Sequence, residues 1–159
     1  LRSYLNSNPD GRFAKAAGTY LAWWEKSSVP GAYRVVLRRG EVEPDVGKWL
    51  SSGGPDLGVV LWVGGVKYGP TPVAPNSRKP IWDYTFSRPI KWKYGDPVVV
   101  EVLDFDWSSS GTAVARFNSP KGDRLAIKML SGTIRLASGG RTTLTFASDF
   151  RMPTLPRPE

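Results

Sequence analysis

The sequence predicts a mainly β protein, an eight-stranded antiparallel β-sandwich preceded by one amphipathic N-terminal helix. Two observations predict this architecture. From Ala32 onward, short runs rich in β-branched and aromatic residues alternate with Gly, Pro, Ser and Asn clusters, the pattern of strands joined by turns. Before Ala32, apolar residues recur at helical spacing instead. With 159 residues, 40% of them hydrophobic, the chain can build one ordinary core.

Residues 1–28 are the predicted helical segment. The Asn-Pro-Asp-Gly sequence at 8–11 is typical of a turn or a helix start, and the Ser-Ser-Val-Pro-Gly sequence at 27–31 ends the helix. Because the apolar stripe is compact and flanked by few basic residues, we expect it to pack on the sandwich or on an upstream helical neighbour rather than on lipid. The stripe consists of Phe13, Ala16, Ala17, Tyr20, Leu21 and Trp24.

Residues 29–151 are the predicted sandwich, and residues 152–159, with three prolines, are expected to be an unstructured tail. In 98–103, one row of valines should face the core while Glu101 faces solvent. Pro70 and Pro72 place the third strand at a sheet edge, because proline cannot donate to a central ladder. Residues 124–130 fit either a short capped helix or another strand. The eight predicted strands are 33–39, 57–63, 67–73, 82–86, 98–103, 112–117, 133–136 and 142–146.

The composition limits which classes of function the chain can have. The chain has no cysteine and no histidine, which leaves oxygen ligands for any metal and removes the commonest general base. Asp104 and Asp106 lie two apart on one strand and so point to the same face. A glycosidase needs two carboxylates on opposite sides of the bond that it cleaves, which this arrangement does not provide. We therefore expect no enzyme. No run approaches the ~18 apolar residues of a membrane span, so the sequence predicts a soluble or peripheral module and specifies no compartment.

Four segments, one of them the apolar run 98–103, resemble in their order and chemistry a C2 domain of a bacterial or divergent type. Asp56 precedes one apolar strand, Asp104-Phe105-Asp106 ends another, and between them the stretch 76–86 keeps the Pro, Trp and Phe of a C2 hairpin. The resemblance covers about 33–146. It implies a C2-like sandwich whose loops at one end hold calcium between carboxylates.

The resemblance implies that Asp56, Asp104 and Asp106 are calcium ligands. Asp45 is the natural partner in the first loop, with Glu43 as the alternative. The remaining position of the last loop falls on Thr112, or, in another register, on Asp123. With a neutral Thr112 there, calcium binding would be weak. Aspartates are also common in turns and at strand ends, so a purely structural role for them stays open.

Basic residues form a second candidate surface. The expected headgroup contacts are Arg78, Lys79, Lys91 and Lys93, and Trp49 and Trp107 lie in the two calcium loops, where they would insert at a lipid interface or pack within the loop. The formal charge of +8 suits polyanionic partners, although a basic face also serves solubility. The wider basic set consists of Arg38, Arg39, Lys67, Arg78, Lys79, Arg88, Lys91 and Lys93, interleaved with Tyr68, Trp92 and Tyr94.

These features predict a calcium-influenced binding module for anionic phospholipid membranes. The alternative is a calcium-independent C2-like sandwich that binds a protein or a carbohydrate. We expect calcium as a weakly held cofactor, an anionic membrane surface or a protein as partner, no nucleic acid, and a monomer. Because the chain begins at Leu1, we also expect it to be part of a larger protein.

Overall fold

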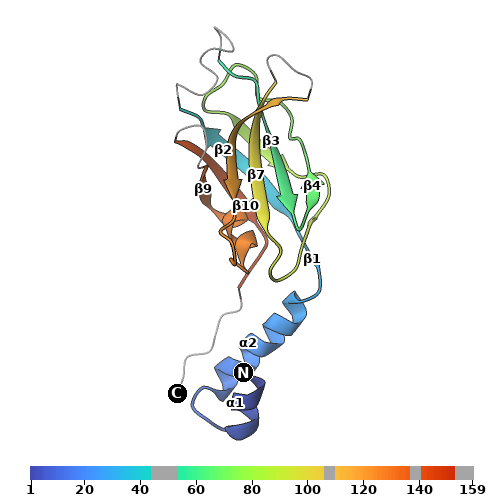
Figure 1. Ribbon diagram of the computed structural model, residues 1–159, viewed down its shortest axis with the longest axis vertical. Helices are drawn as coiled ribbons and strands as arrows, with labels where there is room; N and C mark the ends of the chain where they lie inside the picture. The colour runs from blue at the N-terminus through green and yellow to red at the C-terminus, as the bar shows by residue number, and fades with distance from the viewer. Residues whose placement is uncertain (44–53, 106–109, 137–140, 153–159) are drawn as a thin grey trace.

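The computed structural model describes residues 1–43, 54–105, 110–136 and 141–152. Two four-stranded antiparallel sheets face each other, with strand orders β5-β2-β10-β9 and β4-β3-β7-β8, and a two-stranded ribbon pairs β1 with β6 (Figure 1). The strands are β1 (Gly31–Tyr33), β2 (Val35–Glu41), β3 (Leu57–Val63), β4 (Val66–Tyr68), β5 (Ile81–Thr85), β6 (Ile90–Trp92), β7 (Val98–Asp104), β8 (Thr112–Asn118), β9 (Thr133–Leu136) and β10 (Thr142–Ser148).

The eight strands of the two sheets correspond to the eight predicted strands, so the predicted fold class is confirmed. The third predicted strand is too long, however. The strand β4 ends at Tyr68 because Pro70 and Pro72 lack the N–H that a ladder needs. It is an edge strand, as the prolines predicted. The short strands β1 and β6 were not predicted.

Between the sheets lies a continuous apolar core. On β7, Val98, Val100 and Val102 are fully buried while Glu101 on the alternate row is only partly so, which confirms the predicted alternation. One end of the core is filled by a 3₁₀ helix, η1 (Ala126–Ser131), which contributes three buried side chains. The sequence left open whether residues 124–130 form a short helix or a strand, and the structure shows a helix.

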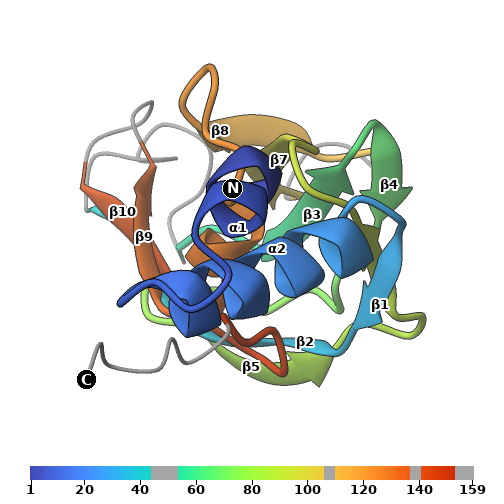
Figure 2. The ribbon, with the colours of Figure 1, turned by 90° about the horizontal axis from the view of Figure 1, so that it is seen from below.

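Two helices, not one, precede the sandwich: α1 (Arg2–Ser7) and α2 (Ala14–Ser27). The break falls at residues 8–11, where the sequence predicted a turn or a helix start. Figures 1 and 2 show both helices beyond one end of the sandwich, which we call the helix end. No helix among the described residues is long and apolar enough to cross a membrane.

Only the last turns of α2 reach the sandwich. Trp23 and Trp24 each meet the ring of Tyr94 edge-on, at centroid distances of 6.3 Å, and the Tyr94 N–H donates to the Ser27 carbonyl. Farther up the helix the predicted stripe faces α1 instead, and Phe13 remains 52% exposed. The expected packing on the sandwich is therefore limited to the C-terminal part of α2.

Candidate functional site

Two acidic residues of the predicted calcium site, Asp56 and Asp104, lie at the end of the sandwich opposite the helices, which we call the loop end. There β7 stops at Asp104 beside the start of β3, with Leu57 paired to Asp104. The Asp56 N–H donates to Asp104 Oδ1 at 3.2 Å, and the Asn76 N–H donates to Asp56 Oδ1 at 2.8 Å. Asp104 is only 2% exposed. The antiparallel register thus brings together two aspartates that lie 48 residues apart.

Of the two alternatives for the last ligand, Thr112 lies at this end and Asp123 does not. Thr112 begins β8 directly opposite Asp104. The strand β8 then runs the length of the sandwich toward the helix end, and Asp123 follows it there, where its Oδ1 accepts the N–H of Leu125 before η1. The inclusion of Asp123 among the ligands is therefore wrong, because a whole strand separates it from Asp104.

Asp45, Asp106, Trp49 and Trp107 lie outside the described residues. Within the described ranges, no three side chains of the kinds that bind metals come together. Calcium takes roughly six to eight oxygen ligands, and two carboxylates supply at most about four. Asp56 and Asp104 alone therefore do not complete a calcium site.

A second group of residues, the basic cluster, consists of Lys67, Arg88 and Lys91 around Tyr68. The Tyr68 side chain is 3% exposed. The Arg88 guanidinium lies 4.7 Å from the centroid of its ring, and the Lys91 backbone N–H donates to its hydroxyl at 2.9 Å. Arg88 Nη2 also donates to the Lys67 carbonyl at 2.6 Å. These contacts fix the Arg88 guanidinium beside Tyr68, whereas the exposed Lys67 and Lys91 take part through their backbones. The Lys67 ammonium itself lies over the Trp62 ring, 5.6 Å from its centroid.

No carboxylate among the described residues pairs with the basic cluster. A small cavity of about 160 Å³ opens beside Arg88 and Lys67 and is also lined by Tyr84 and Ser87. Lys67 and Arg88 were not among the residues singled out for headgroup contact. The sequence feature that could have identified Lys67 and Arg88 was the interleaving of basic residues with Tyr68.

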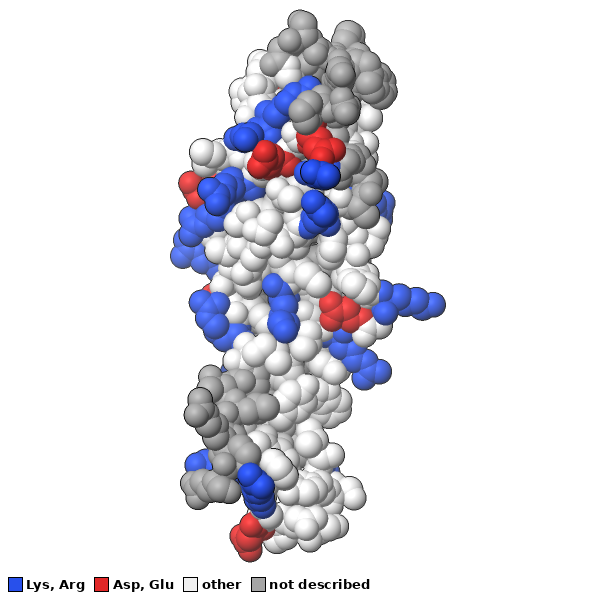
Figure 3. Space-filling view, turned by 90° about the vertical axis from the view of Figure 1, so that its left-hand side faces the viewer, with Lys and Arg blue, Asp and Glu red and all other residues white. Residues whose placement is uncertain are grey.

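The four predicted headgroup residues do not form one patch. Lys91 and Lys93 lie toward the helix end, near Tyr94. Arg78 and Lys79 lie at the loop end among acidic residues: Lys79 Nζ is 3.1 Å from Glu41 Oε1, and Arg78 Nη1 donates to the Glu43 carbonyl. Figure 3, from the side on which β9 lies, shows basic side chains over much of the sandwich with fewer acidic ones between them.

No family model matches the chain, and no curated protein matches it either. Solved C2 domains do match its structure. A structure described as that of a C2 domain aligns with a TM-score of 0.51 at 21% identity, over 72% of this chain and 93% of that one. A structure of two C2 domains of extended synaptotagmin 2 aligns with a TM-score of 0.57 at 15% identity, over 76% and 41%.

The calcium-bound form of the same two domains aligns with a TM-score of 0.51 at 14% identity, over 86% of this chain and 48% of that one. The chain therefore spans most of a single C2 domain and less than half of these two-domain structures. These similarities establish that the protein has the C2-domain fold.

Proposed function

We propose that this C2-fold module binds anionic phospholipid membranes, with the basic cluster as its main headgroup contact. The observation that carries the proposal is the Arg88 guanidinium, which the Tyr68 ring and the Lys67 carbonyl hold in place, with the exposed Lys67 and Lys91 on the neighbouring strands. No carboxylate among the described residues pairs with any of the three. We also propose that the module is a binding domain and performs no catalysis.

The geometry of Arg88 suits a phosphate ligand. Its guanidinium is planar and can donate two parallel hydrogen bonds to phosphate oxygens. The Tyr68 ring and the Lys67 carbonyl hold the side chain, so less conformational freedom is lost when a headgroup binds. Each basic residue near an anionic membrane contributes about 1 kcal/mol. The three together would contribute about 3 kcal/mol, or roughly a hundredfold in affinity.

The loop end offers a second, weaker contact. Asp56 and Asp104 would supply carboxylate oxygens to a calcium ion, together with Asp45 and Asp106 from the adjoining segments. A bound ion would supply the positive charge that attracts lipid phosphate to an acidic surface. The calcium-bound extended synaptotagmin 2 structure supports this proposal. Because Thr112 is neutral and stands opposite Asp104, we expect weak binding.

Vesicle sedimentation tests the proposal, with phosphatidylcholine vesicles that contain or lack phosphatidylserine. The variant Arg88→Gln/Lys91→Gln should lose about thirtyfold in affinity. The control Lys121→Gln/Lys128→Gln removes the same charge from exposed residues outside the cluster and should lose less than about threefold. Binding through the basic cluster should persist in a calcium chelator and weaken as salt rises.

Two results would contradict the proposal. The first is an absence of binding to phosphatidylserine vesicles at low salt, with and without calcium, which would favour a protein-binding sandwich. The second is an equal loss in the two double variants, which would mean that net charge alone, rather than the arrangement around Tyr68, determines binding.

A further inference from the structure

The outer face of the β5-β2-β10-β9 sheet carries a polar groove that is separate from the basic cluster. Strand register places its residues in two rows across the sheet. In one row, Thr145 of β10 lies between Arg39 of β2 and Thr133 of β9. In the next row, Thr143 lies between Glu41 and Arg135. Residues two apart on a strand share a face, so both rows point away from the core.

Two adjoining hollows extend along this face. The first has a volume of about 500 Å³ and contains the row of Arg39, Thr145 and Thr133. The second, of about 540 Å³, shares Glu41, Lys79 and Thr143 with the first and continues to Arg78 and Arg141. Each volume lies within the roughly 300–1,000 Å³ of sites for small organic ligands. Their shared wall makes them one groove with room for two linked units.

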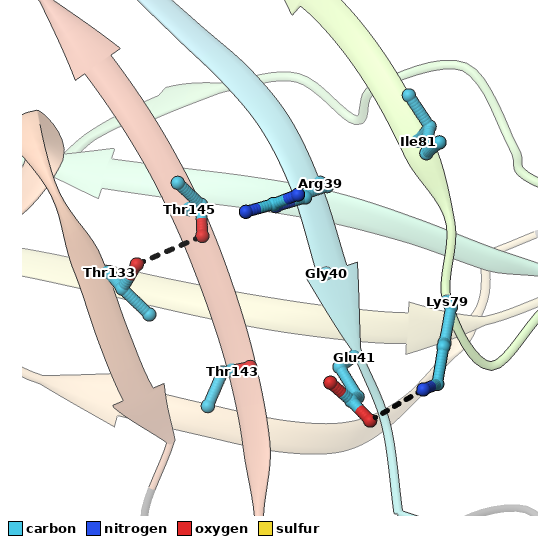
Figure 4. A pocket seen from close by; sticks show the side chains of 8 residues that line it. All are labelled: Arg39, Gly40, Glu41, Lys79, Ile81, Thr133, Thr143 and Thr145. Carbon is cyan, nitrogen blue, oxygen red and sulfur yellow. Dashed lines mark hydrogen bonds and ion pairs between the residues drawn. The ribbon is translucent and has the colours of Figure 1, made fainter.

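Hydrogen-bonding groups of both kinds line the first hollow. Figure 4 shows the Arg39 side chain extending from β2 across the face toward Thr145. The hydroxyls of Thr133 and Thr145 are 3.0 Å apart, and Glu41 pairs with Lys79 at 3.1 Å. No hydrogen bond or ion pair within the described ranges engages the guanidinium of Arg39 or of Arg135, so both are available to a ligand.

We propose that this groove binds an acidic saccharide, a pair of linked sugar units that carry sulfate or carboxylate groups. Arg39 lines the first hollow and supplies a cation for an anionic group. Arg135, across β10 from Glu41, lies beside the groove and adds a second cation at its margin. Threonine hydroxyls, which both donate and accept, suit sugar hydroxyls. Ile81, 75% exposed and paired with Arg39, offers an apolar contact at the rim for the C–H face of a ring.

The carboxylates of the groove favour a saccharide over a densely phosphorylated headgroup. Glu41 lines both hollows and Glu43 lines the second, where its Oε1 lies 3.6 Å from Arg141. A ligand with phosphates on most of its ring positions would bring like charges against them. A sugar with one anionic group per unit presents hydroxyl donors to the same carboxylates. The basic cluster around Tyr68 has no such acceptors among the described residues.

Titration calorimetry with a heparin tetrasaccharide tests the proposal at an ionic strength of about 0.15 M, where exposed charges are screened beyond about 8 Å. The whole chain should bind this probe, and Arg39→Gln should weaken binding about tenfold. Lys91→Gln removes the same charge from the basic cluster and should leave saccharide affinity unchanged. Neutral cellotetraose should bind at least about tenfold more weakly than the heparin fragment.

Thr145→Val gives a second, uncharged variant. It keeps the β-branched shape of the strand residue and removes only the hydroxyl, so it should weaken heparin binding severalfold while net charge stays constant. This variant keeps the test decisive should Arg39→Gln fail to fold.

Three outcomes would overturn the inference. They are no binding of the tetrasaccharide, an equal loss in Arg39→Gln and Lys91→Gln, and a normal affinity in Thr145→Val. Tighter binding of inositol trisphosphate than of heparin, lost in Arg39→Gln, would identify the groove as a phosphate site and would also contradict the saccharide assignment. Vesicle binding by Arg39→Gln should be close to that of the unmodified chain, which separates this groove from the membrane contact.

Discussion

Replacing Tyr68 with phenylalanine separates the scaffold of the basic cluster from its contact with lipid. The change removes the hydroxyl that accepts the Lys91 backbone N–H, at 2.9 Å, from a side chain that is 3% exposed. This hydrogen bond is partly buried, and a donor left there without an acceptor costs about 1–3 kcal/mol. For a chain of 159 residues, each kcal/mol corresponds to about 2–4 °C in Tm. We therefore expect Tm to fall by roughly 2–12 °C.

The affinity of Tyr68→Phe for phosphatidylserine vesicles should change much less than its thermal stability, because phenylalanine keeps the ring beneath the Arg88 guanidinium. Tyr84→Phe is the matched control: it makes the same chemical change on β5, at a tyrosine whose ring packs against Phe86. Thermal unfolding followed by circular dichroism measures both variants. If Tyr68→Phe melts at the same temperature as Tyr84→Phe, the Lys91–Tyr68 hydrogen bond does not support the cluster and the reasoning fails.

Three further predictions concern the loop end, the aromatic core and the helices. Calcium should bind at the loop end with Kd in the roughly 10⁻⁴–10⁻³ M range, as measured by calorimetry. If no heat appears at several millimolar calcium, or if Asp104→Asn binds calcium unchanged, Asp56 and Asp104 are only strand-end residues. Burial and, to a smaller extent, the nearby Asp149 carboxylate raise the pKa of Tyr33. The contribution of Tyr33 to stability is thus complete below its unfolded pKa of about 10 and is lost as pH rises through the higher folded pKa. Alkaline denaturation should therefore lower the stability of Tyr33→Phe less than that of the unmodified chain. Trp23→Ala should lower Tm, because it removes the edge-on contact with Tyr94 that joins α2 to the sandwich, whereas Phe13→Ala, at a residue 52% exposed, should change Tm by less than about 2 °C.

Strand positions were predictable because they depend on local patterns. The run at 98–104 alternates buried and partly buried residues without interruption, and Gly and Pro clusters mark the turns on either side of most strands. The strands β1 and β6 escaped prediction because three residues are too few for a period-two pattern to appear. The extra helix α1 escaped for a similar reason, since its six residues contain no buried side chain.

The site depended on register, which a local pattern does not contain. Asp56 and Asp104 meet because Leu57 pairs with Asp104, and Asp123 is excluded because β8 carries the chain to the other end. Arg78 and Lys79 lie near Lys91 and Lys93 in sequence, yet β5 and β6 take the two pairs to opposite ends of the sandwich. The motif order indicated the fold correctly, whereas the grouping of basic residues required the three-dimensional arrangement.

A β-bulge on β2 explains how two neighbouring arginines are both exposed. Strict alternation from the buried Leu37 would turn Arg39 and Glu41 inward and expose Gly40. The structure exposes Arg38, Arg39 and Glu41 and buries Gly40.

The register of β2 shifts between Leu37 and Arg39 against β5, and the pairing with β10 shifts at the same point. The extra residue lets Arg38 pair with Asp83, whose backbone has a φ of 42°, in the left-handed region. Arg39 then lies across the threonine rows of β10 and β9 (Figure 4). The groove therefore exists because one inserted residue reverses the in-out pattern of β2, and an Arg-Arg pair in a strand that begins apolar is the sequence signal for it.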